Sequence, residues 1–380
     1  MFIEQAYRGK HDFWLYLVGS LIVALAATIG QIPLTIAIFL DRGLDVVGMS
    51  QTELMQSLDP NLLIFLLLLS FAVGFIGLKL AVKYLHQISL MKITTTRKKI
   101  DWGRILLGFG LIAVFSSVSI LIDYQSNPEN YVWNYKPMPF LILCLIAIVM
   151  VPIQTSLEEY IFRGYLMQGF GMGTRHEYFS IGLIATLLIS LILFGANYLY
   201  DLDFGENALI ALVSLIIFVG IHMFLQARKV YDKSSYIKFN NSFQFKFTPL
   251  IITSLIFGLL HLANPEVGKL GYTILFFYIG TGLFLGIITL MDEGMELALG
   301  FHAGNNLVGI ILVTANWTAF QSESLLKDVA EPSIGFDVFL PLLIVYPIFY
   351  IIMAKMYKWN NWKEKLFGKI KAPLETRTPN

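Results

Sequence analysis

Charge and cysteine are scarce in this sequence. Only 14% of its 380 residues are charged, against about 25% in an ordinary soluble domain, while 56% are hydrophobic and the mean hydropathy is +0.68. This composition excludes an ordinary soluble protein. The one cysteine, Cys144, lies in an apolar run and cannot form an intramolecular disulfide. The net charge of +1 argues against a nucleic-acid partner.

The sequence also lacks the motifs of several protease classes. It has no HExxH, so the helix-borne zinc site of zincins is unsupported. It has no GxSxG, which excludes one common serine nucleophile. The GxGD motif of aspartyl intramembrane proteases is missing, because threonine stands at the aspartate position in GMGT, residues 171–174.

Long apolar runs recur along the whole chain. Each is about 20 residues long, the length that an α-helix needs to cross the hydrocarbon core of a bilayer. The runs that we interpret as spans are residues 13–40, 61–82, 105–122, 138–166, 179–200, 207–226, 248–263, 271–291, 295–316 and 337–355. The sequence therefore predicts an all-α polytopic transmembrane helix bundle with about eight to ten spanning helices, embedded in membrane lipid.

The basic residues predict the orientation of these spans. Six Lys and Arg residues lie in residues 83–104, whereas the loops on either side carry one each. Because positive residues stay on the cytoplasmic side, residues 83–104 and both termini are predicted to be cytoplasmic. The loop MDEGME, residues 291–296, is assigned to the same side although it has no Lys or Arg.

Two glutamates and an arginine end one of the runs, in PIQTSLEEYIFRGYL, residues 152–166. Ionisable groups at membrane depth cost roughly 2.5–3.5 kcal/mol each on insertion scales, so they are functional candidates. Glu159 and Arg163 are four residues apart and share a helical face, which predicts a structural ion pair. Glu158 points elsewhere and is expected to face a cavity as an acid or base. The alternative is a helix end that reaches interfacial water.

Three of the six histidines lie within or at the ends of apolar runs: His222 in FVGIH, His261 in FGLLHLANP and His302 in LGFHAGNNLVG. Asn306 follows His302 by four residues, so the two side chains share a helical face. A histidine and an amide on one face, beside glycines, form a plausible wall of a polar site within the membrane.

Three motifs occur in one order: EEYIFR fits EExxxR, FGLLH fits FxxxH and HAGNN fits HxxxN. Together they resemble the motifs of the CPBP family, the CAAX-processing and bacteriocin-processing intramembrane peptidases also called Abi proteins. The resemblance covers roughly residues 140–315. It implies an intramembrane endopeptidase in which Glu158 activates a water, with His261, His302 and Asn306 as catalytic partners and Glu159, Arg163 and Phe257 in support.

The resemblance leaves the role of metal open. Two neutral imidazoles and a carboxylate form a set seen in catalytic zinc sites, so His261, His302 and Glu158 are candidate ligands for Zn²⁺ or another divalent metal. A water activated by glutamate without metal is the alternative. The implied substrates are membrane-associated peptides or proteins, prenylated ones among them, and the resemblance suggests a bacterial inner or plasma membrane.

The spacing departs from the family pattern, because Glu158 and His261 are 103 residues apart and FVGIH offers a second match. We prefer His261 to His222 because Leu, Asn and Pro follow it as in the family motif. The predicted regions are N-terminal helices (1–136), a peptidase-like core with an unusual insertion at about 176–246 (137–316), and a C-terminal helix with a basic tail (317–380).

Two other function classes remain alternatives to the peptidase. A transporter could line its path with buried Glu, His and Asn, and a family relative could have a non-proteolytic immunity or binding role. The sequence indicates no oligomeric state. In the ten-span arrangement His261 lies near the outer end of its helix, so convergence with Glu158 requires a short, tilted or re-entrant segment at 248–263.

Overall fold

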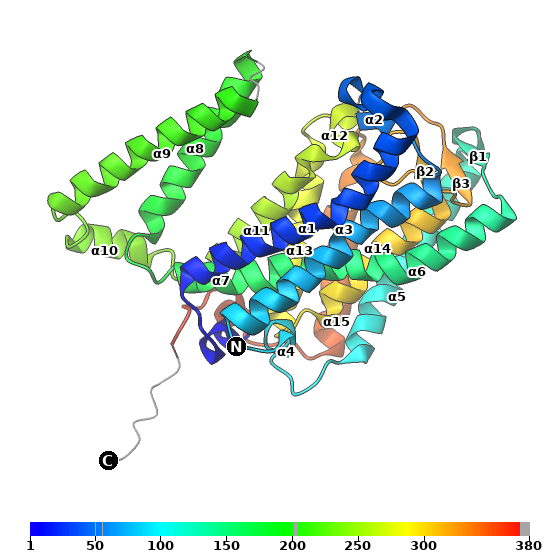
Figure 1. Cartoon of the computed structure of the whole chain (residues 1–380). Helices are drawn as coiled ribbons and strands as arrows, with labels where there is room; N and C mark the ends of the chain where they lie inside the picture. The colour runs from blue at the N-terminus through cyan, green and yellow to red at the C-terminus, as the bar shows by residue number, and fades with distance from the viewer. Residues whose placement is uncertain (50, 55, 201–203, 373–380) are drawn as a thin grey trace.

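The protein is a bundle of apolar helices with a helical arm beside it (Figure 1). The computed structural model describes residues 1–49, 51–54, 56–200 and 204–372. Within them, seven helical segments are long and apolar enough to span a membrane: 13–45, 60–85, 102–126, 137–173, 179–197, 205–227 and 274–292. The predicted all-α, multi-pass architecture is thereby confirmed. Residues 373–380 of the predicted tail lie outside the described residues.

The helices follow the predicted apolar runs closely. The longer helices are α1 (Phe13–Arg42), α3 (Pro60–Leu80), α5 (Trp102–Ser126), α6 (Pro137–Glu159), α8 (Phe179–Tyr200), α9 (Phe204–Ala227), α11 (Phe247–Leu260), α13 (Ile274–Asp292), α14 (Glu296–Leu312) and α15 (Tyr346–Met356). The shorter ones are α2 (Gln51–Leu54), α4 (Leu90–Thr94), α7 (Met167–Gly173), α10 (Ser234–Asn241), α12 (Pro265–Leu270) and α16 (Trp362–Phe367).

Three of the predicted spans form shorter helices than expected. Helix α11 gives way to a single 3-10 turn, His261–Ala263, before Pro265 starts α12. Helix α14 ends at Leu312 because the chain there enters a strand, and a π-helical turn, Pro341–Val345, precedes α15. We expected that His261 could approach Glu158 only if the segment 248–263 were short, tilted or re-entrant. Helix α11 is indeed short.

A small sheet joins the loops at one end of the bundle. Its strands are β1 (Tyr131–Trp133), β2 (Val313–Ala315) and β3 (Leu326–Asp328), in the order β1-β3-β2. Strand β3 pairs antiparallel with β1 and parallel with β2. The sheet therefore ties the connection between α5 and α6 to the segment that follows α14.

Ion pairs join two loops at the opposite end. Arg97 contacts Asp292 at 2.6 Å and Glu296 at 2.9 Å, and Arg104 contacts Asp292 at 2.8 Å. The loop of residues 291–296, which has no basic residue of its own, therefore lies against the basic segment 83–104. This places both loops at one end of the bundle, as the predicted alternation requires; the cytoplasmic assignment of that end stays a prediction.

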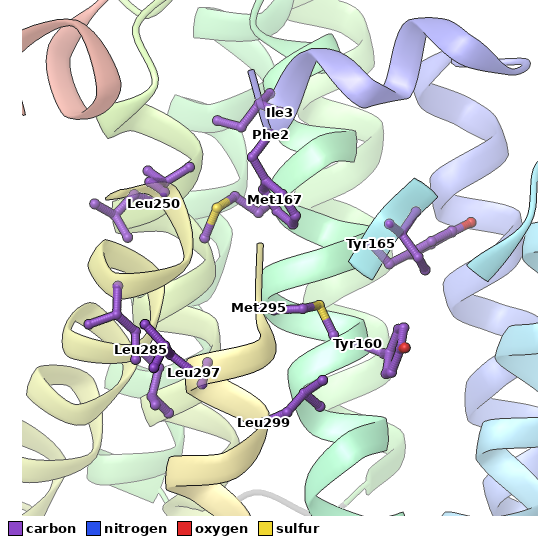
Figure 2. Close-up of a cluster of buried hydrophobic side chains, with 14 of the residues drawn as sticks. Phe2, Ile3, Tyr160, Tyr165, Met167, Leu250, Leu285, Met295, Leu297 and Leu299 are labelled. Atoms are coloured by element: carbon purple, nitrogen blue, oxygen red, sulfur yellow. The ribbon is translucent and has the colours of Figure 1, made fainter. Parts of the chain in front are cut away.

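The hydrophobic core surrounds the start of α14 and the turn that follows α6. Side chains from α7, α11, α13, α14 and that turn meet there, and Phe2 and Ile3 of the N-terminus pack into the same cluster (Figure 2). Helices α5 and α14 approach closely, since a Cβ on Gly300 would lie 1.9 Å from the Ile105 carbonyl oxygen. This packing fixes the position of α14 relative to α6.

The arm consists of α8, α9 and α10, residues 179–241, and stands apart from the bundle in Figure 1. Polar contacts hold its base: Asn240 accepts a hydrogen bond from the Ser180 amide at 2.9 Å and donates one to the His176 carbonyl at 3.0 Å. The rest of the protein covers little of its apolar surface: in segment 205–227, none of the most apolar 18-residue stretch is buried. The arm lies within the predicted insertion, and the boundaries of that insertion stay a prediction.

Candidate active site

A change of helix type sets up the glutamate pair. Helix α6 ends at Glu159, and the chain continues as a π-helical turn, Tyr160–Leu166. Such wide turns are rare and frequently occur at functional sites. Glu159 and Arg163 are nevertheless neighbours across the junction, with 2.8 Å between Arg163 Nη1 and Glu159 Oε1.

The Glu159 carboxylate is completely buried and has two donors. Its Oε1 accepts from the Arg163 guanidinium and, at 2.7 Å, from Nδ1 of His302 on α14. Arg163 is only 2% exposed, and its guanidinium lies 4.2 Å from the centre of the Phe257 ring on α11. A buried carboxylate needs such partners, because an unpaired charge in an apolar interior is costly. Glu159 thus links α6, α14 and the π-helical turn.

Glu158 has a different environment from its neighbour. Its side chain is 18% exposed, and its Oε2 lies 3.4 Å from Nε2 of His302. Its Oε1 accepts a hydrogen bond from Nε2 of Gln154 at 2.6 Å. The His302 ring therefore stands between the two glutamates, with one ring nitrogen directed at each. A cleft of about 390 Å³ lies elsewhere, between the starts of α3 and α6; the cavity expected at Glu158 stays a prediction.

This arrangement determines the hydrogen-bonding role of His302. An ionised carboxylate only accepts hydrogen bonds, so Nδ1 must donate to Glu159. If the ring is neutral, Nε2 carries a lone pair toward Glu158. A favourable contact then needs a proton either on Nε2 or on Glu158. The pair can therefore hold and exchange one proton, which is the requirement for acid–base catalysis.

His261 lies at the end of α11, beside this group. Its Nδ1 lies 2.7 Å from the Phe257 carbonyl oxygen, and its ring stacks on Tyr278 with 4.1 Å between ring centres. The Phe257 ring contacts both imidazoles, with centre distances of 4.8 Å to His261 and 6.1 Å to His302. The Phe257 ring thus links His261 to His302, the residue that contacts both glutamates. The structure thus brings the predicted histidine toward the glutamates.

His222 lies in the arm, on α9. Its Nδ1 is 2.8 Å from the Tyr231 hydroxyl, and the Tyr178 ring packs against it with 4.8 Å between centres. Both aromatic residues belong to the base of the arm. Within the described contacts, His222 meets none of the predicted site residues. Its geometry is that of a histidine packed against aromatic rings.

Asn306 reaches the site through Gln154, a residue outside the three motifs that the sequence did not single out. Nδ2 of Asn306 donates to Oε1 of Gln154 at 3.3 Å, and Gln154 in turn donates to Glu158. Gln154 is only 4% exposed. A signal for it was present, because Gln154 precedes Glu158 by four residues and so lies on the same helical face. Tyr278, the stacking partner of His261, gave no such signal.

The metal prediction can be compared with the side chains as they lie. Nδ1 of both histidines faces an oxygen acceptor, the arrangement that orients metal-binding imidazoles. However, the described part of the chain contains no group of three or more His, Cys, Asp or Glu residues arranged to hold a metal ion. The residues as placed do not form a complete ligand set, so Zn²⁺ or another divalent metal stays a prediction.

Comparisons with known proteins agree with the three motifs. Residues 137–237 and 235–308 match the model of the Rce1-like family, described as type II CAAX prenyl endopeptidase Rce1-like. The chain is 22% identical over 360 residues to the uncharacterized protein YyaK of Bacillus subtilis (strain 168), covering 94% of this chain and 95% of that protein. No solved structure matches. These matches confirm the resemblance recognised in the sequence: residues 137–308 are similar to the Rce1-like family, consistent with the CPBP motifs.

Proposed function

We propose that this chain is an intramembrane endopeptidase that hydrolyses peptide bonds in membrane-associated or lipid-modified substrates, with Glu158 as the base. One observation carries the proposal: His302 stands between a completely buried glutamate that is paired with arginine and a partly exposed one that is not. Two adjacent carboxylates in such different environments suit different roles. Glu159 is held by Arg163 and His302, and Glu158 is available for proton transfer.

The chemistry follows from these contacts. Glu158 takes a proton from water as its oxygen attacks the peptide carbonyl carbon, and the carbonyl oxygen becomes an oxyanion. The amide nitrogen of Asn306 is the donor that would stabilise this charge, since it lies one residue from Glu158 through Gln154. Glu158 then returns its proton to the leaving amine as the carbon–nitrogen bond breaks. The products are a carboxylic acid and an amine.

The two histidines would assist Glu158 in different ways. His302 exchanges the proton with Glu158, because Nε2 is the ring nitrogen that faces it. His261 has its Nδ1 engaged by a carbonyl, which leaves Nε2 free to contact the water or the substrate. Glu159, Arg163 and Phe257 hold His302 and α11 in place.

The substrate class is proposed from the family match. The matching family is described as a prenyl endopeptidase, so prenylated peptides are the first substrates to test. The proposed setting is a bacterial inner or plasma membrane, with both termini cytoplasmic. A transporter or a non-proteolytic relative would use the same buried groups without cleaving a peptide.

Comparison of membrane proteomes tests this proposal directly. Cells that make the wild type or Glu158→Gln at matched levels are compared for peptides with new termini. Glutamine keeps the size of the side chain but cannot accept the proton from water. New termini that require the wild-type glutamate would support an endopeptidase and identify its substrate. Identical termini in both cultures, with both proteins folded in the membrane, would favour a non-proteolytic role.

A further inference from the structure

Gln154 is a buried polar residue that connects the proposed base to the proposed oxyanion donor. It lies on α6, one helical turn before Glu158, and is 4% exposed. Both ends of its amide are engaged: Nε2 donates to Glu158 at 2.6 Å, and Oε1 accepts from Asn306 at 3.3 Å. Burying an amide within a membrane span costs free energy unless the amide is hydrogen-bonded. These two hydrogen bonds therefore explain how Gln154 can be buried there.

The direction of these hydrogen bonds is determined by Glu158. As the base of the proposed reaction Glu158 is a carboxylate, which only accepts hydrogen bonds, so the Gln154 amide must present its nitrogen to Glu158. The Gln154 oxygen then faces Asn306 and can only accept, which requires the Asn306 amide to present its nitrogen. The hydrogen bond between Gln154 and Glu158 therefore fixes the orientation of the Gln154 amide. That orientation in turn determines which end of the Asn306 amide faces the site.

The other end of the Asn306 amide is also engaged. Its Oδ1 accepts from Nδ2 of Asn305 at 3.1 Å, on the side away from Gln154. Nδ2 carries two hydrogens, and Gln154 takes one of them. The second takes part in no described contact, and it is the hydrogen that would be donated to the oxyanion of the proposed reaction. Without Gln154, the one described contact that opposes rotation of the Asn306 amide is the hydrogen bond from Asn305, an exposed residue whose own amide can turn with it.

We infer that Gln154 is a positioning residue for the proposed peptidase: it orients the Asn306 amide so that an N–H group, not the carbonyl oxygen, faces the reacting carbonyl. This inference rests on the proposed function. It predicts an effect on kcat and not on KM, because the oxyanion exists in the transition state and not in the bound substrate. It also predicts that Gln154 has little influence when Asn306 is absent.

A double-mutant cycle tests the inference. The substrate is a synthetic peptide that spans the cleavage site found in the membrane-proteome comparison, presented with purified full-length protein in liposomes. Asn306→Ala removes the donor and is expected to lower kcat by roughly 10²–10³-fold. Gln154→Met keeps the length of the side chain without its hydrogen bonds, and we expect kcat to fall by about 10–100-fold at unchanged KM. The double variant should lie within about twofold of Asn306→Ala.

Gln168→Met is the matched control. Gln168 is also a buried glutamine, completely buried on α7, but its amide donates to the Phe2 and Lys92 carbonyls and not to the site. The control should retain wild-type kcat even if its thermal stability falls as much as that of Gln154→Met. A purely structural role for Gln154 would instead give both variants the same loss. Gln154→Ala serves as the second variant if Gln154→Met does not fold.

The outcomes separate this inference from the proposed function. If wild type and Glu158→Gln cleave the peptide equally, the proposed function fails and the inference fails with it. If the wild type depends on Glu158 but Gln154→Met keeps its kcat, only the inference is overturned. It is also overturned if the losses from Gln154→Met and Asn306→Ala multiply in the double variant, because Gln154 would then act independently of Asn306.

Discussion

Two parts of this molecule are almost equally apolar and are packed very differently. In the bundle, 39% of the most apolar 18-residue stretch of segment 137–173 is buried. In the arm, none of the corresponding stretch of segment 205–227 is buried. Both satisfy the length and hydropathy of a membrane span. Apolar character therefore predicts which solvent a helix requires, but not whether other helices cover it.

A cluster of buried charged side chains distinguishes the bundle from the arm. Segment 137–173 carries Gln154, Glu158, Glu159 and Arg163, and each contacts a polar group or ring from another part of the chain or from its own helix. Such contacts require close neighbours. On helix α9, by contrast, large apolar side chains are exposed along most of its length, and the hydrogen bond of His222 is with Tyr231. Buried polar partners thus indicate where helices converge.

The histidines offer the sharpest test of this contrast. His302→Ala removes the group between the two glutamates and His261→Ala removes the ring beside Glu158, so each should lower proteolysis by roughly 10²-fold or more. His222→Ala in the arm should retain most of it. Cleavage of the peptide by purified variants in liposomes gives the measurement. Strong loss in His222→Ala with normal His261→Ala activity would reverse the assignment of the second motif.

The buried ion pair should dominate the stability of the bundle. Arg163→Met leaves the Glu159 carboxylate buried with one donor fewer, which should cost about 3–5 kcal/mol. Lys136→Met breaks a pair with Glu323 in which the lysine side chain is 59% exposed, and should cost less than about 1 kcal/mol. Thermal unfolding in one detergent compares them. Equal decreases in melting temperature would mean that burial of the Arg163–Glu159 pair does not determine its contribution to stability.

A pair of isoleucines tests the packing difference without charge. Ile288 on α13 is completely buried, whereas Ile216 on α9 is 62% exposed. Ile288→Ala should therefore cost about 2–5 kcal/mol through lost contacts and a cavity, while Ile216→Ala should stay within about 0.5 kcal/mol because lipid replaces the lost methyl groups. Thermal unfolding again supplies the comparison. A large cost at Ile216 would show that another surface covers the arm.

Local helical spacing predicted much of the candidate site. Four-residue spacing placed Arg163 beside Glu159, and the structure has that contact at 2.8 Å. It also placed Asn306 one turn after His302. These relations depend on a single helix, so the sequence alone contains them. The apolar runs likewise predicted the helices, because their length depends on the membrane and not on tertiary contacts.

Contacts between helices were not predictable in the same way. Nothing in the spacing indicates that His302 stands between Glu158 and Glu159, since this depends on how α14 packs against α6 and α5. Helix α14 ends early because β2 pairs with β3, a strand that lies further along the chain. Gln154 was missed because its role appears only when Asn306, 152 residues away, is brought beside it.

The smallest expected effect concerns a buried histidine outside the site. His86 is 1% exposed, with Nδ1 2.6 Å from the Lys10 carbonyl and Nε2 2.8 Å from the Tyr165 hydroxyl; the Tyr16 ring packs on it. Burial lowers the pKa of His86 from its ordinary value of 6.5, against a smaller opposing effect of the Lys10 carbonyl. Below pH 6.5 the unfolded chain therefore binds more protons at this residue than the folded protein does.

Stability contributed by neutral His86 should be complete above its unfolded pKa and should decline as the pH falls from there through the lowered pKa of the folded state. His86→Phe keeps a ring against Tyr16 but cannot titrate, so its melting temperature should fall less than that of the wild type between about pH 7.5 and about pH 5.5. The other histidines titrate in both proteins, so the difference isolates His86. Parallel pH profiles would show that protonation of His86 is not linked to unfolding.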